Sequence, residues 1–229
     1  MNCKTSVQSS TCLGLFAKYW QPGQVKTRLA SSVGADHSAA IYRRMVETLL
    51  QRLGQVACDH LLAYSPADRS GSFEAILPTG WHLEPQSGGD LGSRMEAFFS
   101  RRFAEGYERV LLLGSDSPDL PLAHVHTAVD ALAAHEVVLG PTEDGGYYLV
   151  GARQRVPPIF GPLPWGTAEV WRATVDALRS SGLAYATLDA WYDVDQEADY
   201  HRLVARIAKS KDAALAKLHD HLAAADLLP

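Results

Sequence analysis

The fold is decided by the stretch Val110-Leu111-Leu112-Leu113-Gly114-Ser115-Asp116-Ser117-Pro118-Asp119-Leu120. A short apolar run that is closed by Gly and Pro is typical of a buried parallel strand. In open α/β sheets the ligand crevice lies outside the carboxyl ends of the strands. Asp116 follows directly after this run, so we expect its carboxylate to face substrate rather than the core. Asp116 is therefore a candidate for a metal or phosphate site.

Short apolar runs alternate with amphipathic segments of helical length along the rest of the chain. This βαβα order predicts an α/β fold, in which a mainly parallel sheet is covered by helices on both faces. Strands are predicted at 13–18, 56–64, 81–84, 109–114, 136–140, 146–151 and 184–188. Helices are predicted at 36–53, 90–104, 122–134, 167–181, 196–208 and 211–228, the last of which packs on the body of the protein.

Length and composition predict a single domain. The 229 residues are 47% hydrophobic, which suffices for one large core, and we expect that core to form within 13–229 behind a flexible tail at 1–12. The net charge of -5 argues against broad attraction to nucleic acid or to an anionic membrane. The apolar stretch 13–17 is too short for a signal peptide or a membrane span.

The cysteines favour a reducing environment. There are three of them, Cys3, Cys12 and Cys58, and their irregular spacing fits neither a disulfide framework nor a zinc site. We therefore expect a cytoplasmic protein. The histidine pairs His124-x-His126 and His219-x-His221 lie on predicted helices and face different directions, so we expect them to be solvated. No nucleophile signature such as G-x-S-x-G is present, which makes covalent acyl chemistry an unfavoured reading.

The loop after the first predicted strand carries three cations, Lys18, Lys26 and Arg28. Arginine can grip phosphate oxygens with two hydrogen bonds and lysine supplies a point charge, so such a loop suits a diphosphate. The loop contains neither G-x-x-x-x-G-K-[ST] nor G-x-G-x-x-G, so it is no standard nucleoside triphosphate or dinucleotide cradle. The alternative is a solvated basic loop.

A glycine turn from Gln86 to Gly92 precedes the helix predicted at 90–104. Glycines let the backbone approach a ligand, and a helix N-terminus favours anions. We expect the turn to contact ligand, and we expect Asp90 to cap the helix by accepting hydrogen bonds from its amides.

Two acidic pairs follow predicted strands. Asp116 and Asp119 form Asp-Ser-Pro-Asp, and Asp193 and Asp195 form Asp-Val-Asp. Magnesium and manganese prefer carboxylates and water, with substrate phosphates completing the shell. We predict that Asp116 and Asp195 share one ion and that Asp119 caps the helix that begins near Pro121. The alternative for Asp195 is a cap on the helix that begins at residue 196.

Two further segments could contact a sugar or an acceptor. The turn Glu143-Asp144-Gly145-Gly146-Tyr147 could close on a ligand, or it could be a plain hairpin turn, because Asp-Gly is a standard turn signal. Trp165 in Leu-Pro-Trp-Gly-Thr could stack on a sugar or base, although packing is the commoner fate of a tryptophan.

Several motifs, taken in order across about residues 13–200, resemble one family. They are Phe-Ala-Lys at 16–18, Pro-Gly-x-Val-Lys-Thr-Arg-Leu at 22–29, Asp-Leu-Gly-x-Arg-Met at 90–95, Gly-Ser-Asp-Ser-Pro-Asp-Leu at 114–120, Gly-Pro-x-x-Asp-Gly-Gly-Tyr-Tyr-Leu-x-Gly at 140–151, Trp-Gly-Thr at 165–167 and Asp-Val-Asp at 193–195. The set is similar to the small bacterial glycosyltransferase-A-like family associated with radical-SAM enzymes and arsenosugar biosynthesis. One departure is Tyr19-Trp20, which stands where that family commonly has a small-residue pair such as Ala-Pro.

The resemblance implies a nucleotide-diphospho-sugar transferase fold, a Rossmann-like α/β/α sandwich related to phospholactate guanylyltransferase and molybdenum-cofactor guanylyltransferase. It places Phe16, Ala17, Lys18, Lys26, Arg28, Gln86, Asp90, Gly92 and Ser115 on the nucleotide and phosphate side. It places Asp144, Gly145, Gly146, Tyr147 and Trp165 on the sugar or acceptor side. Asp116 and Asp195 match the positions that hold the divalent cation, Mg²⁺ or Mn²⁺.

The function predicted from these residues is transfer of a sugar from a nucleoside diphosphate sugar to a small acceptor, with Asp116 on the metal and Asp144 as a candidate acceptor base. One alternative is nucleotidyl transfer to a phosphorylated metabolite with release of pyrophosphate, because the same fold and carboxylates serve both chemistries. A second alternative is a nucleotide-binding module without turnover. Base, sugar, acceptor and oligomeric state are left open.

Overall fold

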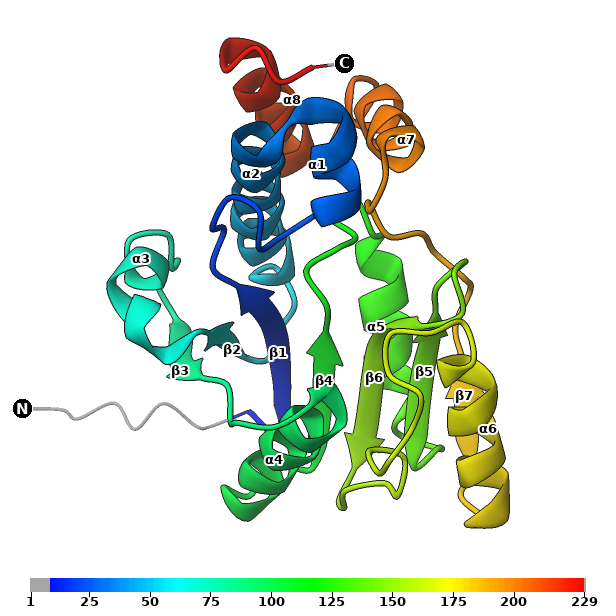
Figure 1. Cartoon of the computed structure of the whole chain (residues 1–229). Coiled ribbons are helices and arrows are strands. Elements are labelled where there is room, and N and C mark those ends of the chain that lie inside the picture. The colour runs from blue at the N-terminus through cyan, green and yellow to red at the C-terminus, as the bar shows by residue number, and fades with distance from the viewer. Residues whose placement is uncertain (1–8, 229) are drawn as a thin grey trace, which may run out of the picture.

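The computed structural model describes residues 9–228. Their middle layer is one seven-stranded sheet with the order β3-β2-β1-β4-β6-β5-β7 (Figure 1). The strands are β1 (Thr11–Lys18), β2 (Asp59–Ser65), β3 (Trp81–Pro85), β4 (Arg109–Leu113), β5 (Val137–Pro141), β6 (Tyr147–Arg153) and β7 (Tyr185–Thr187). The predicted α/β class and each predicted strand are confirmed.

One strand runs against the rest of the sheet. β6 is antiparallel to both β4 and β5, whereas the other neighbouring pairs are parallel. The turn between β5 and β6 spans only residues 142–146, and a connection that short can join only antiparallel strands. The hairpin interpretation of this turn is therefore confirmed. As a consequence, the first residue of β6 lies at the same edge of the sheet as the carboxyl ends of the other strands.

The flexible tail predicted at 1–12 extends too far, because β1 already begins at Thr11. Thr11 and Cys12 are buried within β1, where Cys12 pairs with Asp59 of β2 and Val110 of β4. The apolar pattern seemed to start at Leu13 because Thr11 is polar, but its side chain is covered by the sheet. Residues 1–8 lie outside the described residues.

Eight α-helices are described, together with a 3-10 turn at Ala67–Arg69. They are α1 (Thr27–Val33), α2 (Ala35–Leu53), α3 (Ser70–Glu74), α4 (Leu91–Ala104), α5 (Leu122–Ala131), α6 (Val170–Ser180), α7 (Glu197–Ile207) and α8 (Ala213–Ala224). The sequence did not predict α1 and α3. Both are short and each buries a single side chain, Leu29 and Phe73, so they leave no periodic pattern to detect.

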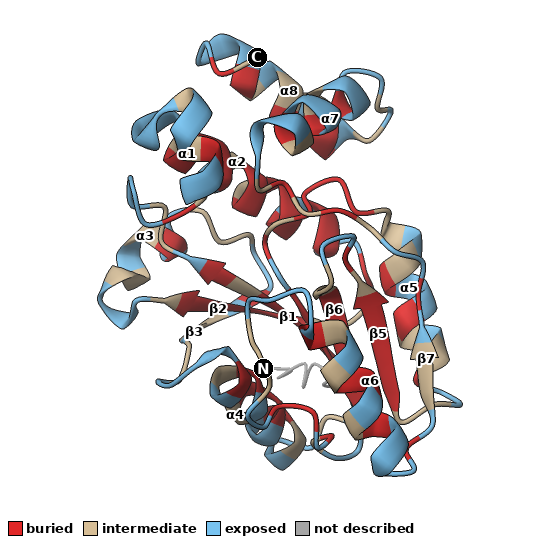
Figure 2. Cartoon of the chain, turned by 45° about the vertical axis from the view of Figure 1, so that its right-hand side comes forward, coloured by how far each residue is buried: buried red, intermediate tan, exposed pale blue. Residues whose placement is uncertain are grey.

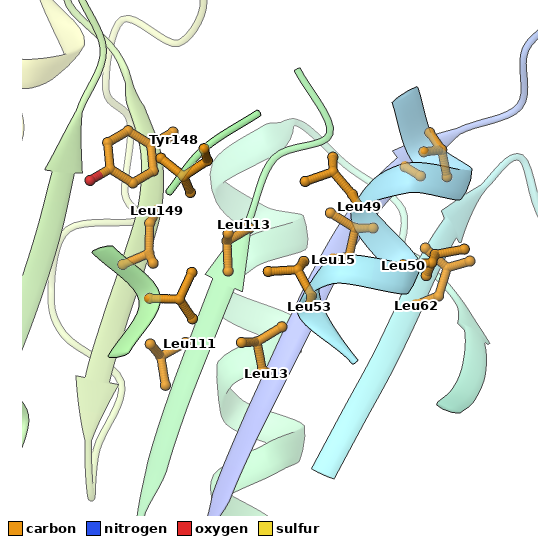
Figure 3. Packing of buried hydrophobic residues seen from close by; sticks show 14 of the residues in the cluster. Leu13, Leu15, Leu49, Leu50, Leu53, Leu62, Leu111, Leu113, Tyr148 and Leu149 are labelled. Atoms are coloured by element: carbon orange, nitrogen blue, oxygen red, sulfur yellow. The ribbon is translucent and has the colours of Figure 1, made fainter. Parts of the chain in front are cut away.

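The helices cover both faces of the sheet. α2 and α5 lie on one face, where Leu49 and Leu53 pack on Leu13 and Leu15 of β1 (Figure 3). α4 and α6 lie on the other face and bury Phe99 and Leu178, among others. The strands between these layers are mostly buried, and the outer helix faces are exposed (Figure 2). The predicted three-layer sandwich is thus observed.

A third apolar cluster joins the C-terminal helices to the start of the chain. Leu29 of α1, Met45 of α2, Leu203 of α7 and Leu218 of α8 are all buried in it, and the four helices lie together at one end of the molecule (Figure 1). The predicted packing of the C-terminal helix is therefore observed. This cluster anchors α1, which begins directly after Lys26. Across residues 9–228, none of the helices combines the length and the apolar character that crossing a membrane requires.

Candidate functional site

A pocket of about 610 Å³ opens at the edge of the sheet where the parallel strands end. Of the predicted site residues, its lining contains Phe16, Ala17, Lys18, Lys26, Gln86, Ser115, Asp116, Tyr147 and Asp195. They come from the ends of β1, β3 and β4, the residue before α1, the start of β6, and the segment before α7. Residues distant in sequence meet here because parallel strands deliver their carboxyl ends to one edge of the sheet.

Two carboxylates converge on one buried ammonium at the floor of this pocket. Lys26 Nζ donates a short hydrogen bond to Asp116 Oδ1 and another, of 2.9 Å, to Asp195 Oδ1. The side chain of Lys26 is 3% exposed, whereas those of Asp116 and Asp195 are 41% and 38% exposed. Burial lowers the pKa of Lys26, but the two carboxylates more than offset this effect and leave its pKa above the usual value. Lys26 is therefore charged.

Lys26 reaches this position through an unusual backbone conformation. It is the N-cap residue of α1, with φ 47° and ψ 45°, in the left-handed region that non-glycine residues rarely adopt. Next along the helix, Leu29 turns into the apolar cluster while Arg28 stays exposed. Among the described residues that line the pocket, Arg28 is absent, so the structure separates it from Lys18 and Lys26.

The two acidic segments are held together by a set of hydrogen bonds. Ser117 Oγ donates to Asp193 Oδ1 at 2.7 Å, and the backbone N–H of Val194 donates to the carbonyl oxygen of Asp116 at 2.9 Å. These bonds join the loop after β4 to the segment before α7. They explain why Asp116 and Asp195 face the same point.

Asp119 completes this connection. The prediction that Asp119 caps α5 is wrong. Its buried carboxylate accepts hydrogen bonds from Tyr192 Oη at 2.8 Å, Arg206 Nε at 2.6 Å and Trp191 Nε1 at 3.4 Å. The N-cap of α5 is Pro121, which has no side-chain cap. The spacing from Asp119 to α5 is typical of a helix cap. The groups that donate hydrogen bonds to its carboxylate lie more than seventy residues away, so the sequence near Asp119 does not indicate them.

Asp195 likewise does not cap α7. The N-cap is Gln196, which forms a reciprocal capping box with Asp199. Asp195 is thus free to face the pocket, as the metal prediction requires.

Asp193 and Tyr42 belong to the site but were not predicted as site residues. Burial, followed by the nearby carboxylate of Asp116, raises the pKa of Asp193 to about 7. Tyr42 lines the pocket, where its hydroxyl lies 2.6 Å from Ser115 Oγ and accepts from the backbone N–H of Lys18 at 3.1 Å. Tyr42 was missed because a tyrosine on an amphipathic helix is typical of a core residue. Asp193 was missed because the burial of a carboxylate cannot be predicted from the sequence around it.

The raised pKa of Asp193 predicts a pH dependence of stability. The folded state holds the proton more tightly than the unfolded state, so the stabilisation is complete below about pH 4 and is lost as the pH rises through about 7. Between pH 4 and pH 8 the free energy of unfolding of the wild type should fall, relative to Asp193→Asn, by on the order of 3 kcal/mol, since one pKa unit corresponds to about 1.4 kcal/mol. Urea unfolding at both pH values, with EDTA present, measures this. Parallel pH profiles for the two proteins would show that Asp193 titrates normally.

Another side of the pocket is built from the residue after β3 and the start of α4. Gln86 Nε2 donates to the carbonyl oxygens of Ala17 at 3.2 Å and Ala63 at 2.9 Å, which fixes the side chain with Oε1 as its remaining polar atom. Asp90 caps α4 as predicted, with Ser93 N–H donating to Oδ1 at 2.8 Å. Within the described lining, α4 contributes Leu91, Arg94 and Met95 in place of Asp90.

Gly92 and Trp165 pack against each other beside the pocket, and neither is among its described lining residues. A Cβ atom at Gly92 would lie 2.5 Å from both Phe160 O and Trp165 Nε1. The indole of Trp165 in turn contacts the ring of Tyr147 edge to face, with centroids 6.3 Å apart. Trp165 therefore supports Tyr147, which does line the pocket.

Gly92→Ala should test this packing against a matched control. The added methyl group meets a backbone oxygen that cannot move freely, so we expect a loss of about 1–3 kcal/mol in the free energy of unfolding. At Gly88 a Cβ atom meets nothing within 4 Å, and Gly88→Ala should leave stability within about 0.5 kcal/mol of the wild type. Equal melting temperatures for the two variants would contradict the described packing.

The turn before β6 is shaped by Asp144. Its Oδ1 accepts hydrogen bonds from Thr142 Oγ1 at 2.5 Å and Gly146 N–H at 3.2 Å. Gly145 has a φ of 96°, and a Cβ atom there would lie 2.5 Å from Ala168 O. Asp144, Gly145 and Gly146 are not among the described residues that line the pocket. The charge of Asp144 is nevertheless one of the influences that raise the pKa of Asp193.

Comparisons with known proteins agree with this architecture. The family model described as "Uncharacterized protein conserved in bacteria (DUF2064)" matches residues 48–167. No curated protein matches the chain. A crystal structure of a candidate nucleotide-diphospho-sugar transferase from Desulfovibrio desulfuricans G20 is 37% identical, covers 95% of this chain and 96% of its own, and superposes with a TM-score of 0.86.

More distant structures share the fold alone. A cytidylyltransferase from Leptospira borgpetersenii serovar Hardjo-bovis is 13% identical, with a TM-score of 0.60 over 96% of this chain and 97% of its own. CMP:2-keto-3-deoxy-manno-octonic acid synthetase complexed with CTP is 14% identical, with a TM-score of 0.57 over 87% of this chain and 98% of its own. The predicted nucleotide-diphospho-sugar transferase fold is confirmed, and the chain belongs to the bacterial family described as DUF2064.

Proposed function

We propose that the protein is a divalent-metal-dependent transferase that passes the sugar of a nucleoside diphosphate sugar to a small acceptor. The observation that carries this proposal is the convergence of Asp116 and Asp195 on one cation, the Lys26 ammonium, inside the pocket at the strand ends. The 37% identical relative bears the name of a candidate nucleotide-diphospho-sugar transferase, and the fold is shared with a cytidylyltransferase, which supports a nucleotide-utilising transferase. The metal dependence and the transfer of a sugar are the parts of this function that we propose beyond that likeness.

The residues present fit a Mg²⁺ or Mn²⁺ ion. The two carboxylates are partly exposed toward the pocket, and each has only its Oδ1 engaged by Lys26. Ions of this class are usually held by one or two carboxylates, with substrate phosphates and water completing the shell. Asp116 and Asp195 would hold the ion, and it would supply positive charge to a leaving diphosphate.

The chain's own cations would bind the phosphates. Lys18 and Lys26 line the pocket together with Thr27 at the first turn of α1. Ammonium groups that are fixed before the reaction stabilise charge as it develops on the leaving group, without the cost of reorienting water. Gln86, held by two backbone carbonyl groups, would lie against the nucleoside.

The sugar and acceptor would occupy the side of the pocket nearest β6. Tyr147 lines this side, and Gly145, Gly146 and Trp165 shape the turn and the packing behind it. Asp144 is the candidate acceptor base, because its carboxylate is exposed at this turn. The closer resemblance to the radical-SAM and arsenosugar-associated family, with its guanylyltransferase relatives, supports a small acceptor. We also propose a cytoplasmic protein with a single domain, which begins with β1.

Product analysis tests the proposal. The protein is incubated with a panel of sugar nucleotides and, separately, of nucleoside triphosphates with phosphorylated acceptors, each with and without Mn²⁺. Accumulation of nucleoside diphosphate from a sugar nucleotide is the expected result. Pyrophosphate from a triphosphate would replace glycosyl transfer by nucleotidyl transfer, and calorimetric binding without either product would indicate a binding module.

A further inference from the structure

Lys26 occupies one oxygen of each of the two carboxylates that would hold the divalent ion. Its ammonium engages Oδ1 of both Asp116 and Asp195 and is almost fully removed from solvent. The ring of Tyr42 lies beneath it, with 5.8 Å between Nζ and the ring centroid. The backbone of Lys26 is fixed at the start of α1, and Leu29 anchors that helix in the apolar cluster. The ammonium is therefore delivered to the acidic pair by rigid structure.

This arrangement weakens the binding of a divalent ion in the absence of substrate. A metal that binds Asp116 and Asp195 meets the positive charge of Lys26 within the same hydrogen-bonded cluster. Repulsion between two neighbouring positive charges is substantial at the effective dielectric constant of a protein site, and it is screened little where one charge is buried. The acidic pair of the free protein is thus already partly neutralised by an internal cation.

A diphosphate changes this balance. Lys26 lines the same pocket as Lys18 and Thr27, so phosphate oxygens in that pocket offer its ammonium alternative acceptors. The phosphates also bring negative charge and further ligands for the metal. Both effects favour the metal only when the phosphates are present.

We propose that Lys26 is a positioning residue that makes divalent-metal binding depend on the diphosphate, so that the ion enters with the substrate's phosphates and not as a free ion. The inference rests on the proposed function, because it assumes that Asp116 and Asp195 hold the metal. It adds that the accepted ligand is a metal–diphosphate complex.

The test measures Mn²⁺ binding without any turnover. The EPR signal of free Mn²⁺ is titrated with wild type, Lys26→Met and Lys26→Arg, alone and with inorganic pyrophosphate. Lys26→Met removes the charge and should bind Mn²⁺ alone at least about tenfold more tightly than the wild type. Lys26→Arg keeps the charge and should bind as weakly as the wild type. Pyrophosphate should tighten binding by the wild type far more than by Lys26→Met.

Three outcomes would overturn the inference: equal Mn²⁺ affinity of wild type and Lys26→Met, tight binding by Lys26→Arg, or no Mn²⁺ binding by any of the proteins. The double variant Lys26→Met with Asp116→Asn should lose the increase in Mn²⁺ affinity that Lys26→Met shows. If the double variant kept this increase, the ion would bind at a site other than Asp116, which would also overturn the inference. Circular dichroism confirms that each variant is folded. The proposed function fails by a different result, the absence of transfer products from the wild type, so the two failures are distinguishable.

Discussion

Asp116→Asn is expected to lower the rate of transfer by about a thousandfold or more and to leave the fold intact. The substitution keeps the shape of the side chain but removes the charge that pairs with Lys26 and that would hold the proposed metal. Preorganised charge at a site of this kind contributes a large share of the stabilisation of the transition state. The substitution weakens the pairing of the buried Lys26 ammonium, but Asp195 still pairs with it, so the variant should stay folded with a lowered melting temperature. Initial rates at saturating Mn²⁺, with melting temperatures measured in parallel, give both quantities.

Asp130→Asn is the matched control for this prediction. Asp130 is exposed on α5, outside the described pocket lining, and the substitution makes the same change of charge and shape. We expect the rate of this variant to equal that of the wild type. If Asp116→Asn retained full activity, Asp116 would have no part in the chemistry.

Asp119→Ala is expected to lower the free energy of unfolding by about 3 kcal/mol. The substitution leaves the buried hydroxyl of Tyr192 without its acceptor and breaks the ion pair with Arg206. Removing one partner of a buried polar network costs the desolvation of the groups that remain. Because this network also joins the loop carrying Asp116 to the segment carrying Asp195, we expect transfer activity to fall as well. Urea unfolding followed by circular dichroism measures the stability.

Two milder variants separate the causes. Asp119→Asn keeps an acceptor for Tyr192 and should lose less stability than Asp119→Ala. Arg206→Met removes an ionic partner that is 46% exposed, so its loss should stay within about 1 kcal/mol. If Asp119→Ala unfolded at the same urea concentration as the wild type, the network would not hold the two segments together.

The sequence was sufficient for the features that depend on strand order. An apolar run followed by Asp116 predicted both the strand and the direction of the carboxylate, since the ends of parallel strands face the crevice. Lys18, Gln86 and Ser115, which the family resemblance placed on the nucleotide and phosphate side, also lie close to the ends of strands and line the pocket. The position of Asp116 was predictable from local pattern and topology alone.

The features that depend on contacts between loops were not predictable. Asp119 has the spacing of a helix cap, and only the folded chain shows that Tyr192 and Arg206 claim its oxygens. The raised pKa of Asp193 follows from burial beside Asp116, which no spacing reveals. Arg28 appeared to join Lys26 in one loop, but α1 separates them by turning Arg28 to the solvent.

We propose that two carboxylates, Asp116 and Asp195, which are distant in the chain, bind one divalent ion. Anomalous diffraction at the manganese edge, from crystals grown with Mn²⁺ and pyrophosphate, tests it most directly. We expect an anomalous peak that both Asp116 and Asp195 coordinate. A peak bound by other residues, or no peak between these two side chains, would contradict it.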